Sequence, residues 1–256
     1  MKDIHSHVLF GIDDGAKTIE DSLELIKMAK SIGYDGIVCS SHFCPEQYEN
    51  KNYDRNFEIL KNRLIEEKID VTLYKGNEVA LHPNVFNKLN IINTINNGKY
   101  ILIELHYGII FQTCAKFLAK LQSLGYKPIL AHIERYYKFT AKQFIELYNT
   151  GVILQVNIRQ INYLSQDIKY LFKQRYIGLV ATDSHNLTRR SYDVGEYLDY
   201  LKNFVGDEYF NILTEENPSK ILNNQEIKKG EVHNEKTNNR NIFTAFWNKL
   251  FPRNGA

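Results

Sequence analysis

The chain begins Met1-Lys2-Asp3-Ile4-His5-Ser6-His7, and no other stretch is more informative about it. If these residues form a β-strand, His5 and His7 project from the same face, because alternate residues of a strand point the same way. Two neutral imidazoles on one face can bind a single metal ion. A lone His-x-His pair is common on protein surfaces, so its meaning depends on the segments that follow.

Short β-branched runs alternate with amphipathic stretches along most of the chain. After the opening strand, further strands are predicted at 36–42, 71–78, 100–106, 128–132, 152–156 and 177–183. Helices are predicted from the N-cap Thr18 to Gly33, and near 54–68, 112–124, 140–150, 161–175 and 189–204. This alternation is typical of an α/β protein with parallel strands and right-handed crossovers. About seven such units favour closure into a barrel over an open sheet.

Histidine and acidic residues recur where these strands end. In βα barrels the functional residues gather at the carboxyl ends of the strands, so these side chains are expected to meet. Five residues stand at strand ends, and the opening histidine pair together with Asp14 and His185 raises the number of candidate metal ligands to nine. The nine are His5, His7, Asp14, His42, Glu78, Glu104, His132, Asp183 and His185. Nine ligands exceed what one ion needs, which indicates two or three ions. Carboxylates with imidazoles suit Mn, Zn, Fe or Mg better than copper or an iron–sulfur centre. Such a cluster could clamp the attacking and leaving oxygens of a phosphoryl transfer.

Composition excludes several other functions. The 256 residues carry 32 Lys and Arg against 30 Asp and Glu, and a net charge of +2 does not favour a nucleic-acid partner. A cysteine-based tyrosine phosphatase needs an arginine six residues after its cysteine, but Asn50, Pro45 and Lys120 stand six residues after Cys44, Cys39 and Cys114. Without a secretory segment or an apolar run of about 18 residues, the expected location is the cytoplasm.

Six motifs in order along residues 1–222 resemble the PHP (polymerase and histidinol phosphatase) superfamily. More narrowly, they resemble its CpsB/YwqE-type bacterial manganese-dependent protein tyrosine phosphatases. The motifs are His5-Ser6-His7, Gly11-Ile12-Asp13-Asp14-Gly15, Ser41-His42, Gly76-Asn77-Glu78, His132-Ile133-Glu134-Arg135-Tyr136 and Asp183-Ser184-His185-Asn186. Residues 1–222 would then form one PHP metallophosphatase domain, with the PHP fold of a distorted (β/α)7 TIM-like barrel.

The resemblance also implies how the ligands divide among three ions, with Mn²⁺ favoured over Fe, Zn or Mg. His5, His7, Glu78 and Asp183 would hold one ion; Glu78 would bridge to a second, completed by Glu104 and His132; His42 and His185 would hold the third. Asp14 would be a ligand or a proton-handling group. Arg135 and Arg190 would bind the phosphate during catalysis, with Arg189 as the alternative to Arg190. Glu134 is expected to be structural, and His82, His106 and His233 are expected to lie outside the ligand set.

The function that the resemblance implies is hydrolysis of phosphotyrosine by a metal-activated hydroxide, without a covalent phosphoenzyme. The protein partner would be the tyrosine-rich tail of a bacterial tyrosine kinase that controls capsule or exopolysaccharide production. A small-molecule phosphatase, such as one acting on histidinol phosphate, is the alternative with the same chemistry. A PHP exonuclease is disfavoured because the chain has no polymerase domain. A barrel kept only as a scaffold is disfavoured because every candidate ligand is present.

The last part of the chain differs in character. Residues 223–241 are polar and charged and are predicted to be a flexible linker. Residues 242–251 are predicted to form an amphipathic helix, with Ile242, Phe246 and Leu250 in one row of a helical face. Three interpretations stay open: a helix docked on the body or on a neighbouring subunit, a peripheral anchor on the inner membrane face, and a partner-protein motif.

Overall fold

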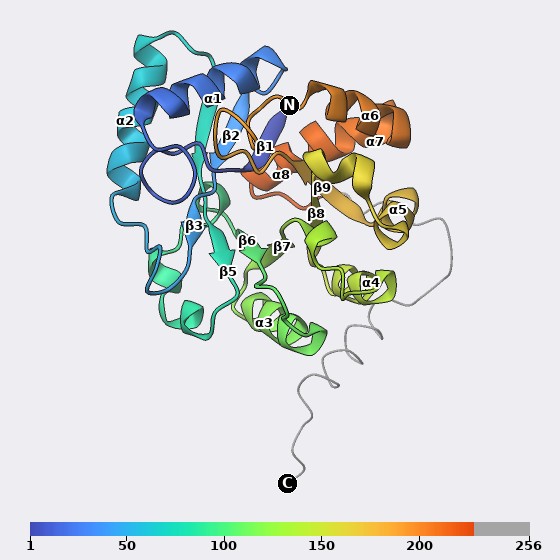
Figure 1. Cartoon of the computed structure of the whole chain (residues 1–256). Helices are drawn as coiled ribbons and strands as arrows, with labels where there is room; N and C mark the ends of the chain where they lie inside the picture. The colour runs from blue at the N-terminus through green and yellow to red at the C-terminus, as the bar shows by residue number, and fades with distance from the viewer. Residues whose placement is uncertain (228–256) are drawn as a thin grey trace.

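All ladders between named strands are parallel in the computed structural model, which describes residues 1–227. Figure 1 shows the strands at the centre and the helices outside them. The predicted α/β class with parallel strands is therefore confirmed. The strands are β1 (Lys2–Ser6), β2 (Gly36–Cys39), β3 (His42–Phe43), β4 (Thr72–Lys75), β5 (Glu78–Ala80), β6 (Tyr100–Glu104), β7 (Lys127–Leu130), β8 (Ile153–Asn157) and β9 (Ile177–Ala181).

The helices connect these strands on the outside. They are α1 (Ile19–Ser31), α2 (Tyr53–Glu66), α3 (Phe111–Ser123), α4 (Ala141–Asn149), α5 (Gln166–Lys173), α6 (Gly195–Val205), α7 (Asp207–Asn211) and α8 (Asn217–Leu222). Thr18 begins α1 as predicted, in a capping box with Asp21, and Thr140 begins α4 in the same way with Gln143.

The strands follow seven paths, but their pairing is divided between two sheets rather than closed into one barrel. One sheet has the order β1-β2-β4, and the other has the order β3-β5-β6-β7-β8-β9. The second path breaks between β2 and β3 at Ser40-Ser41, and the third between β4 and β5 at Gly76-Asn77. Gly76 fits this crossing because a Cβ on it would lie 2.5 Å from Val38 Cγ1. The closed barrel that the sequence predicts is thus interrupted where strand ends turn toward the histidine and acidic side chains.

The first and last strand paths meet through a short contact beyond the ladders. Ser6 and Ser184 form an isolated parallel bridge. The His7 amide donates to the Ser184 carbonyl, and the Asp183 amide donates to the His5 carbonyl, each at 2.8 Å. This bridge is what brings the opening His-x-His pair beside the Asp-Ser-His motif near the end of the fold.

Two predicted helices begin later than the sequence indicates. The helix predicted at 189–204 starts only at Gly195, so the prediction was wrong for 189–194. Tyr192, which is fully buried, donates to Asp3 Oδ2 at 2.8 Å, and this tertiary bond prevails over helical propensity. Similarly, a 3-10 turn occupies Ile158–Tyr163, and α5 starts at Gln166 after its N-cap Ser165.

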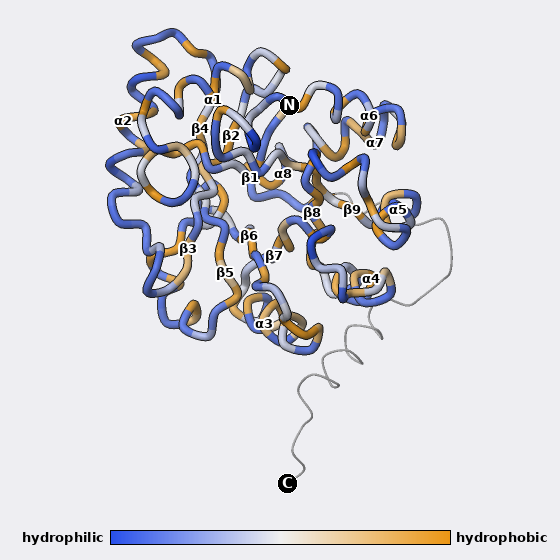
Figure 2. Tube along the Cα trace, in the orientation of Figure 1, coloured by the Kyte–Doolittle hydropathy of each residue, from blue (hydrophilic) through white to orange (hydrophobic). Residues whose placement is uncertain are grey.

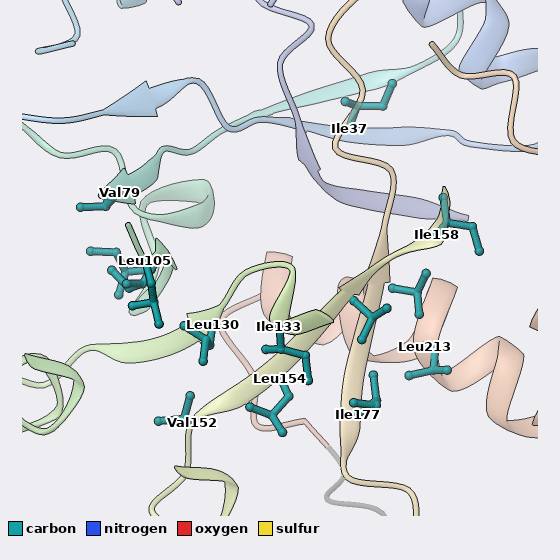
Figure 3. Packing of buried hydrophobic residues seen from close by; sticks show 14 of the residues in the cluster. Ile37, Val79, Leu105, Leu130, Ile133, Val152, Leu154, Ile158, Ile177 and Leu213 are labelled. Atoms are coloured by element: carbon teal, nitrogen blue, oxygen red, sulfur yellow. The ribbon is translucent and has the colours of Figure 1, made fainter. Parts of the chain in front are cut away.

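Two clusters of buried hydrophobic residues stabilise this arrangement. The larger contains residues from most strands and from the helices that cover them, and Figure 3 shows part of it, with Leu130, Leu154 and Ile177 labelled. The smaller joins strand residues such as Leu102 and Leu179 to Ile221 of α8. Figure 2 shows hydrophobic colour along the strands and alternating colours along the helices, as expected for helices buried on one face.

The described chain continues beyond α8 as far as residue 227. Asn224 Oδ1 accepts from the Lys99 amide at 2.9 Å, and the Gln225 carbonyl accepts from the Tyr100 hydroxyl at 2.6 Å. The first residues of the predicted linker therefore lie against the body. The rest of the predicted linker and the predicted helix at 242–251 lie outside the described residues. Within residues 1–227, no helix is both long enough and apolar enough to span a membrane.

A buried carboxylate joins β1, the end of β9 and the loop before α6. Asp3 is fully buried and accepts hydrogen bonds from the Thr182 hydroxyl at 2.5 Å and the Tyr192 hydroxyl at 2.8 Å. The amides of His5 and Thr182 donate to its other oxygen, each at 3.2 Å. Burial raises the pKa of Asp3, and these four donors act in the opposite direction.

We expect Asp3→Ala to lower the free energy of unfolding by about 2–4 kcal/mol, because it leaves two buried hydroxyls without an acceptor. Tyr192→Phe removes only one donor, so about 1 kcal/mol is expected from it. Denaturant unfolding in the presence of a chelator measures both variants without a contribution from bound metal. An Asp3→Ala change below 0.5 kcal/mol would contradict this role.

Candidate metal centre

The nine predicted ligands converge at the carboxyl ends of the strands. Their donor atoms form three overlapping groups, within each of which all atoms lie within 4.8 Å of one another. Eight of the nine residues belong to these groups. The ninth, His132, contacts Glu78 directly, with its Nε2 at 2.7 Å from Glu78 Oε1. The groups are His5, His7, Glu78 and Asp183; His7, Asp14, His42 and His185; and His42, Glu78 and Glu104.

The first group is deeply buried. His5 Nε2 and His7 Nε2 each lie 3.2 Å from Glu78 Oε2, and they lie 3.4 and 3.6 Å from Asp183 Oδ1. Donor atoms about 2.1 Å from a shared ion are separated by roughly 3.0–3.4 Å in octahedral or tetrahedral sets. The observed separations match this range to within a few tenths of an ångström, so the four side chains can hold an ion with little movement.

The other two groups share His42. Its Nε2 lies 3.3 Å from Asp14 Oδ1, and His185 Nε2 lies 3.4 Å from the same oxygen. On its other side, His42 Nδ1 lies 3.2 Å from both Glu78 Oε2 and Glu104 Oε1. Glu104 is therefore grouped with His42 and Glu78, whereas the family resemblance implies Glu104 with His132. Glu78 is central in either arrangement.

Several buried polar atoms of the cluster contact charged neighbours without a well-aligned hydrogen bond. Asp183 Oδ1, His42 Nδ1 and His185 Nε2 are such atoms, at 2.6 Å from Arg190, 3.2 Å from Glu78 and 3.4 Å from Asp14. Buried polar groups in folded proteins are nearly always paired. These three atoms belong to residues of the candidate metal groups, and they combine carboxylate oxygen with imidazole nitrogen. This donor set fits hard or borderline divalent ions.

The carboxylates of the cluster change the protonation of several histidines. Burial disfavours a charged His7, but Asp13 and Glu78 prevail and raise its pKa to about 9. Burial likewise opposes a charged His42, yet Asp14, Glu104 and Glu78 raise its pKa to about 12. The protein alone therefore balances its buried negative charge with protons, which divalent ions would displace. His185 differs, because burial and the neighbouring His7 lower its pKa to about 4.

The two predicted arginines lie at the edge of the cluster. Arg135 Nη2 is 2.5 Å from Asp183 Oδ2, and Arg190 Nη2 is 2.6 Å from Asp183 Oδ1. Their side chains are 36% and 34% exposed, so both guanidinium groups can be reached by a molecule arriving from solvent. Arg189, the alternative, is exposed, and no contact joins it to Asp183.

Of the residues expected to lie outside the ligand set, those that the structure describes belong to none of the three groups. Glu134 accepts from the Asn157 amide at 3.3 Å, and burial raises its pKa to about 7. His82 Nδ1 accepts from the Asn84 amide at 3.2 Å and caps a turn. His106 is exposed, and His233 lies outside the described residues.

Several residues that hold the ligands in place have no role predicted from the sequence. Asp13 Oδ2 lies 2.7 Å from His7 Nδ1 and accepts from the His42 amide at 2.8 Å. Gly15 allows this loop to fold back, because a Cβ on it would lie 2.2 Å from the His7 carbonyl oxygen. The Gly-Ile-Asp-Asp-Gly motif contains Asp13, but the sequence predicts its neighbour Asp14 as the candidate ligand.

Strand β8 and the turn after β7 supply the remaining support. Gln155 Oε1 lies 3.1 Å from His5 Nδ1 and accepts from the His132 amide at 2.9 Å. The Asn157 amide group donates to Asp183 Oδ2 at 2.7 Å, and the Tyr136 hydroxyl lies 3.2 Å from His132 Nδ1. Gln155 and Asn157 alternate along an otherwise apolar strand, and this pattern was a signal that they face the site.

Two of the candidate ligands have unusual backbone conformations. His132 has φ of 32° and Asp183 has φ of 54°, which is the left-handed region that residues other than glycine rarely adopt. Such strain concentrates at functional sites, where the surrounding bonds enforce it.

Comparison with known proteins agrees with this geometry. A family described as "Capsular polysaccharide synthesis, CpsB/CapC" matches residues 1–223. The chain belongs to the CpsB/CapC family. Among relatives of this CpsB/CapC protein, the tyrosine-protein phosphatase CpsB of Streptococcus agalactiae is 30% identical, with 89% of this chain and all of that one covered. The tyrosine-protein phosphatase YwqE of Bacillus subtilis is also 30% identical, with 89% and 93% covered.

A solved structure gives the same result for the fold of the CpsB/CapC protein. It comes from work on YwqE of Bacillus subtilis and CpsB of Streptococcus pneumoniae, described as unique metal-dependent tyrosine phosphatases. The TM-score is 0.81 at 29% identity, and the match covers 93% of this chain and all of the other. The resemblance drawn from the motifs is confirmed.

We expect Asp13→Asn to weaken metal binding by about 10–100-fold, as the loss of a carboxylate behind a ligating histidine typically does. Competition with a chelating dye measures the affinity, and Asp70→Asn, an exposed position with no part in the cluster, is the matched control. Wild-type affinity in Asp13→Asn would show that Asp13 does not position His7.

Proposed function

We propose that this chain is a metal-dependent protein tyrosine phosphatase that acts on a protein of the capsule synthesis machinery. One observation carries the proposal: Asp183 faces the candidate metal groups and also contacts the guanidinium groups of Arg135 and Arg190, whose side chains are about one-third exposed. Such a site can bind a phosphate between cationic groups on both sides. Its accessible edge favours a phosphate carried on a protein, and the family's role in capsular polysaccharide synthesis supports the same substrate class.

The side chains of this chain have distinct parts in the reaction. Divalent ions, when bound, would activate water and offset the negative charge of the phosphate. The nine proposed ligands would hold two or three ions, with Mn²⁺ favoured over Fe, Zn or Mg. Arg135 and Arg190 would bind the equatorial phosphate oxygens and stabilise the charge that grows in the transition state.

The reaction depends less on proton transfer by side chains than on stabilisation of the negative charge of the phosphate. The hydrogen bonds from His185 and His42 hold the pKa of Asp14 well below its usual range, so Asp14 acts as a ligand or proton acceptor rather than as an acid. A tyrosine leaving group needs little acid assistance, since its free pKa is only about 10.

The cysteines support a mechanism without a thiolate. Cys39, Cys44 and Cys114 are all buried, and burial raises the pKa of each thiol. A catalytic cysteine needs the opposite, a lowered pKa and access to substrate.

We expect the Mn²⁺-loaded protein to release phosphate from a phosphotyrosine peptide much faster than from a phosphoserine peptide or from histidinol phosphate. EDTA should abolish the activity, and added Mn²⁺ should restore it. Arg135→Ala should lower kcat about 10²–10³-fold, while Arg189→Ala should stay near wild type. Metal analysis of the purified protein identifies the ion. Preference for histidinol phosphate would instead favour the small-molecule phosphatase, and activity that survives EDTA would contradict a metal mechanism.

We further propose that the substrate is the tyrosine-rich tail of a bacterial tyrosine kinase and that the enzyme works in the cytoplasm. Residues 242–251 would supply a contact to the inner membrane face or to a neighbouring subunit, which their amphipathic pattern supports.

Removal of residues 228–256 tests the role of the tail while keeping the contacts of Asn224 and Gln225 with the body. We expect the shortened protein to keep its turnover of phosphotyrosine peptide and to shift from the membrane fraction to the supernatant, or to a smaller assembly in size-exclusion chromatography. If neither distribution changes, the tail has no such role.

A further inference from the structure

Exposed hydrophobic side chains occur in several loops at the end of the strands that carries the candidate metal ligands. Five of those in the described residues lie in the loops after β6, β7, β8 and β9, and their exposed fractions range from 41% to 87%. In a parallel sheet these loops share the end that carries the metal ligands. Clustered exposed apolar side chains mark an interaction surface more often than scattered ones do. The five are Tyr107, Ile110, Tyr137, Tyr163 and Leu187.

Two of these side chains border a crevice that reaches the catalytic edge. The loops after β6 and β7 form it, and its empty space is about 300 Å³ with the solvent at its mouth included. Its apolar lining is open to solvent, so it offers a contact surface for one side chain rather than an enclosed pocket for a second substrate. Its lining includes Leu105, Tyr107, Ile109, Tyr137 and Phe139, together with Arg135.

Arg135 connects the crevice to the phosphate site. Its guanidinium contacts Asp183 at the metal centre, and the same residue lines the crevice. A group in the crevice therefore lies next to whatever phosphate Arg135 binds. In an extended peptide successive residues advance by about 3.3 Å, so a near neighbour of the phosphotyrosine is within reach.

The inner part of the crevice is held by contacts with the rest of the fold. The Phe139 ring packs against Phe111 and Phe144, with ring centroids 5.6 and 5.7 Å apart. The Tyr136 hydroxyl accepts from the Leu105 amide at 3.0 Å and also contacts His132. The crevice is thus preformed, while Tyr107 and Tyr137, at 87% and 79% exposed, remain open to a partner.

We propose that this crevice is a specificity subsite for an apolar side chain beside the phosphotyrosine of a peptide substrate. The inference rests on the proposed phosphatase function. The apolar side chain packs against Tyr107 and Tyr137, and tyrosine offers a large contact area at a small loss of side-chain entropy. The lining contains Arg135 and Lys138 and no carboxylate, so a basic neighbour is disfavoured there.

The test compares two phosphotyrosine peptides of equal length and charge, one with leucines and one with serines on both sides of the phosphotyrosine. For the wild-type protein we expect kcat/KM to be about tenfold higher for the leucine peptide, the scale of one buried apolar side chain. The double variant Tyr107→Ala/Tyr137→Ala should bring this ratio close to one. Tyr137→Phe, which keeps the ring, should retain the preference.

Tyr163→Ala is the matched control, because Tyr163 is equally exposed in a neighbouring loop but does not line the crevice. Its ratio should equal that of the wild type. Phenyl phosphate, which has no neighbouring residue, reports whether the metal centre works in each variant. A wild-type ratio near one, or an unchanged ratio in the double variant, would overturn the subsite. Turnover of phenyl phosphate with neither peptide hydrolysed would instead refute the protein phosphatase function, and the subsite with it.

Discussion

A carboxylate buried as deeply as Glu78, which is 1% exposed, can stay ionised only among cationic or hydrogen-bonding groups. Its two oxygens contact four imidazoles, those of His5, His7, His42 and His132. These histidines come from three separate strand paths, so the strands must end in register around one point. The breaks at Ser40-Ser41 and Gly76-Asn77 and the left-handed backbone of His132 are the local adjustments that this convergence imposes. The way the strands end is therefore tied to the need to compensate the buried charge of Glu78.

Much of this arrangement could be predicted from the sequence, because the ligands occur at strand ends and strand periodicity places them on one face. The spacing of His5 and His7 and the positions of Glu78 and Asp183 needed only that reasoning. Asp13 could not be assigned in the same way, since it lies in a loop without periodicity. The alternation of Gln155 with Asn157 indicates which face of β8 they share, but not which ligands they contact. Their roles depend on distances between segments far apart in the chain.

In the elements that differ from the sequence predictions, tertiary contacts likewise override local sequence patterns. Residues 189–194 have a helical pattern, yet the buried bond between Tyr192 and Asp3 keeps them out of the helix. The structure differs from the predicted closed barrel for a related reason. The number of βα units predicts how many strands there are, but not whether each neighbouring pair of strands forms a continuous ladder. The crevice at Tyr107 and Tyr137 joins two loops that no sequence pattern connects. Such features arise only once the loops are placed by the strands beneath them.

The bridge between Ser6 and Ser184 also determines when the candidate ion site can form during synthesis of the chain. His5 is synthesised long before Asp183, so the candidate ion site that they share cannot exist on a partial chain that ends before Asp183. Closing a loop of this length carries an entropic penalty, which an ion bound at its ends helps to offset. A bound ion would therefore hold the ends of β1 and β9 together. Metal supply would then govern how long the ends of β1 and β9 stay together, and not only how fast the protein works.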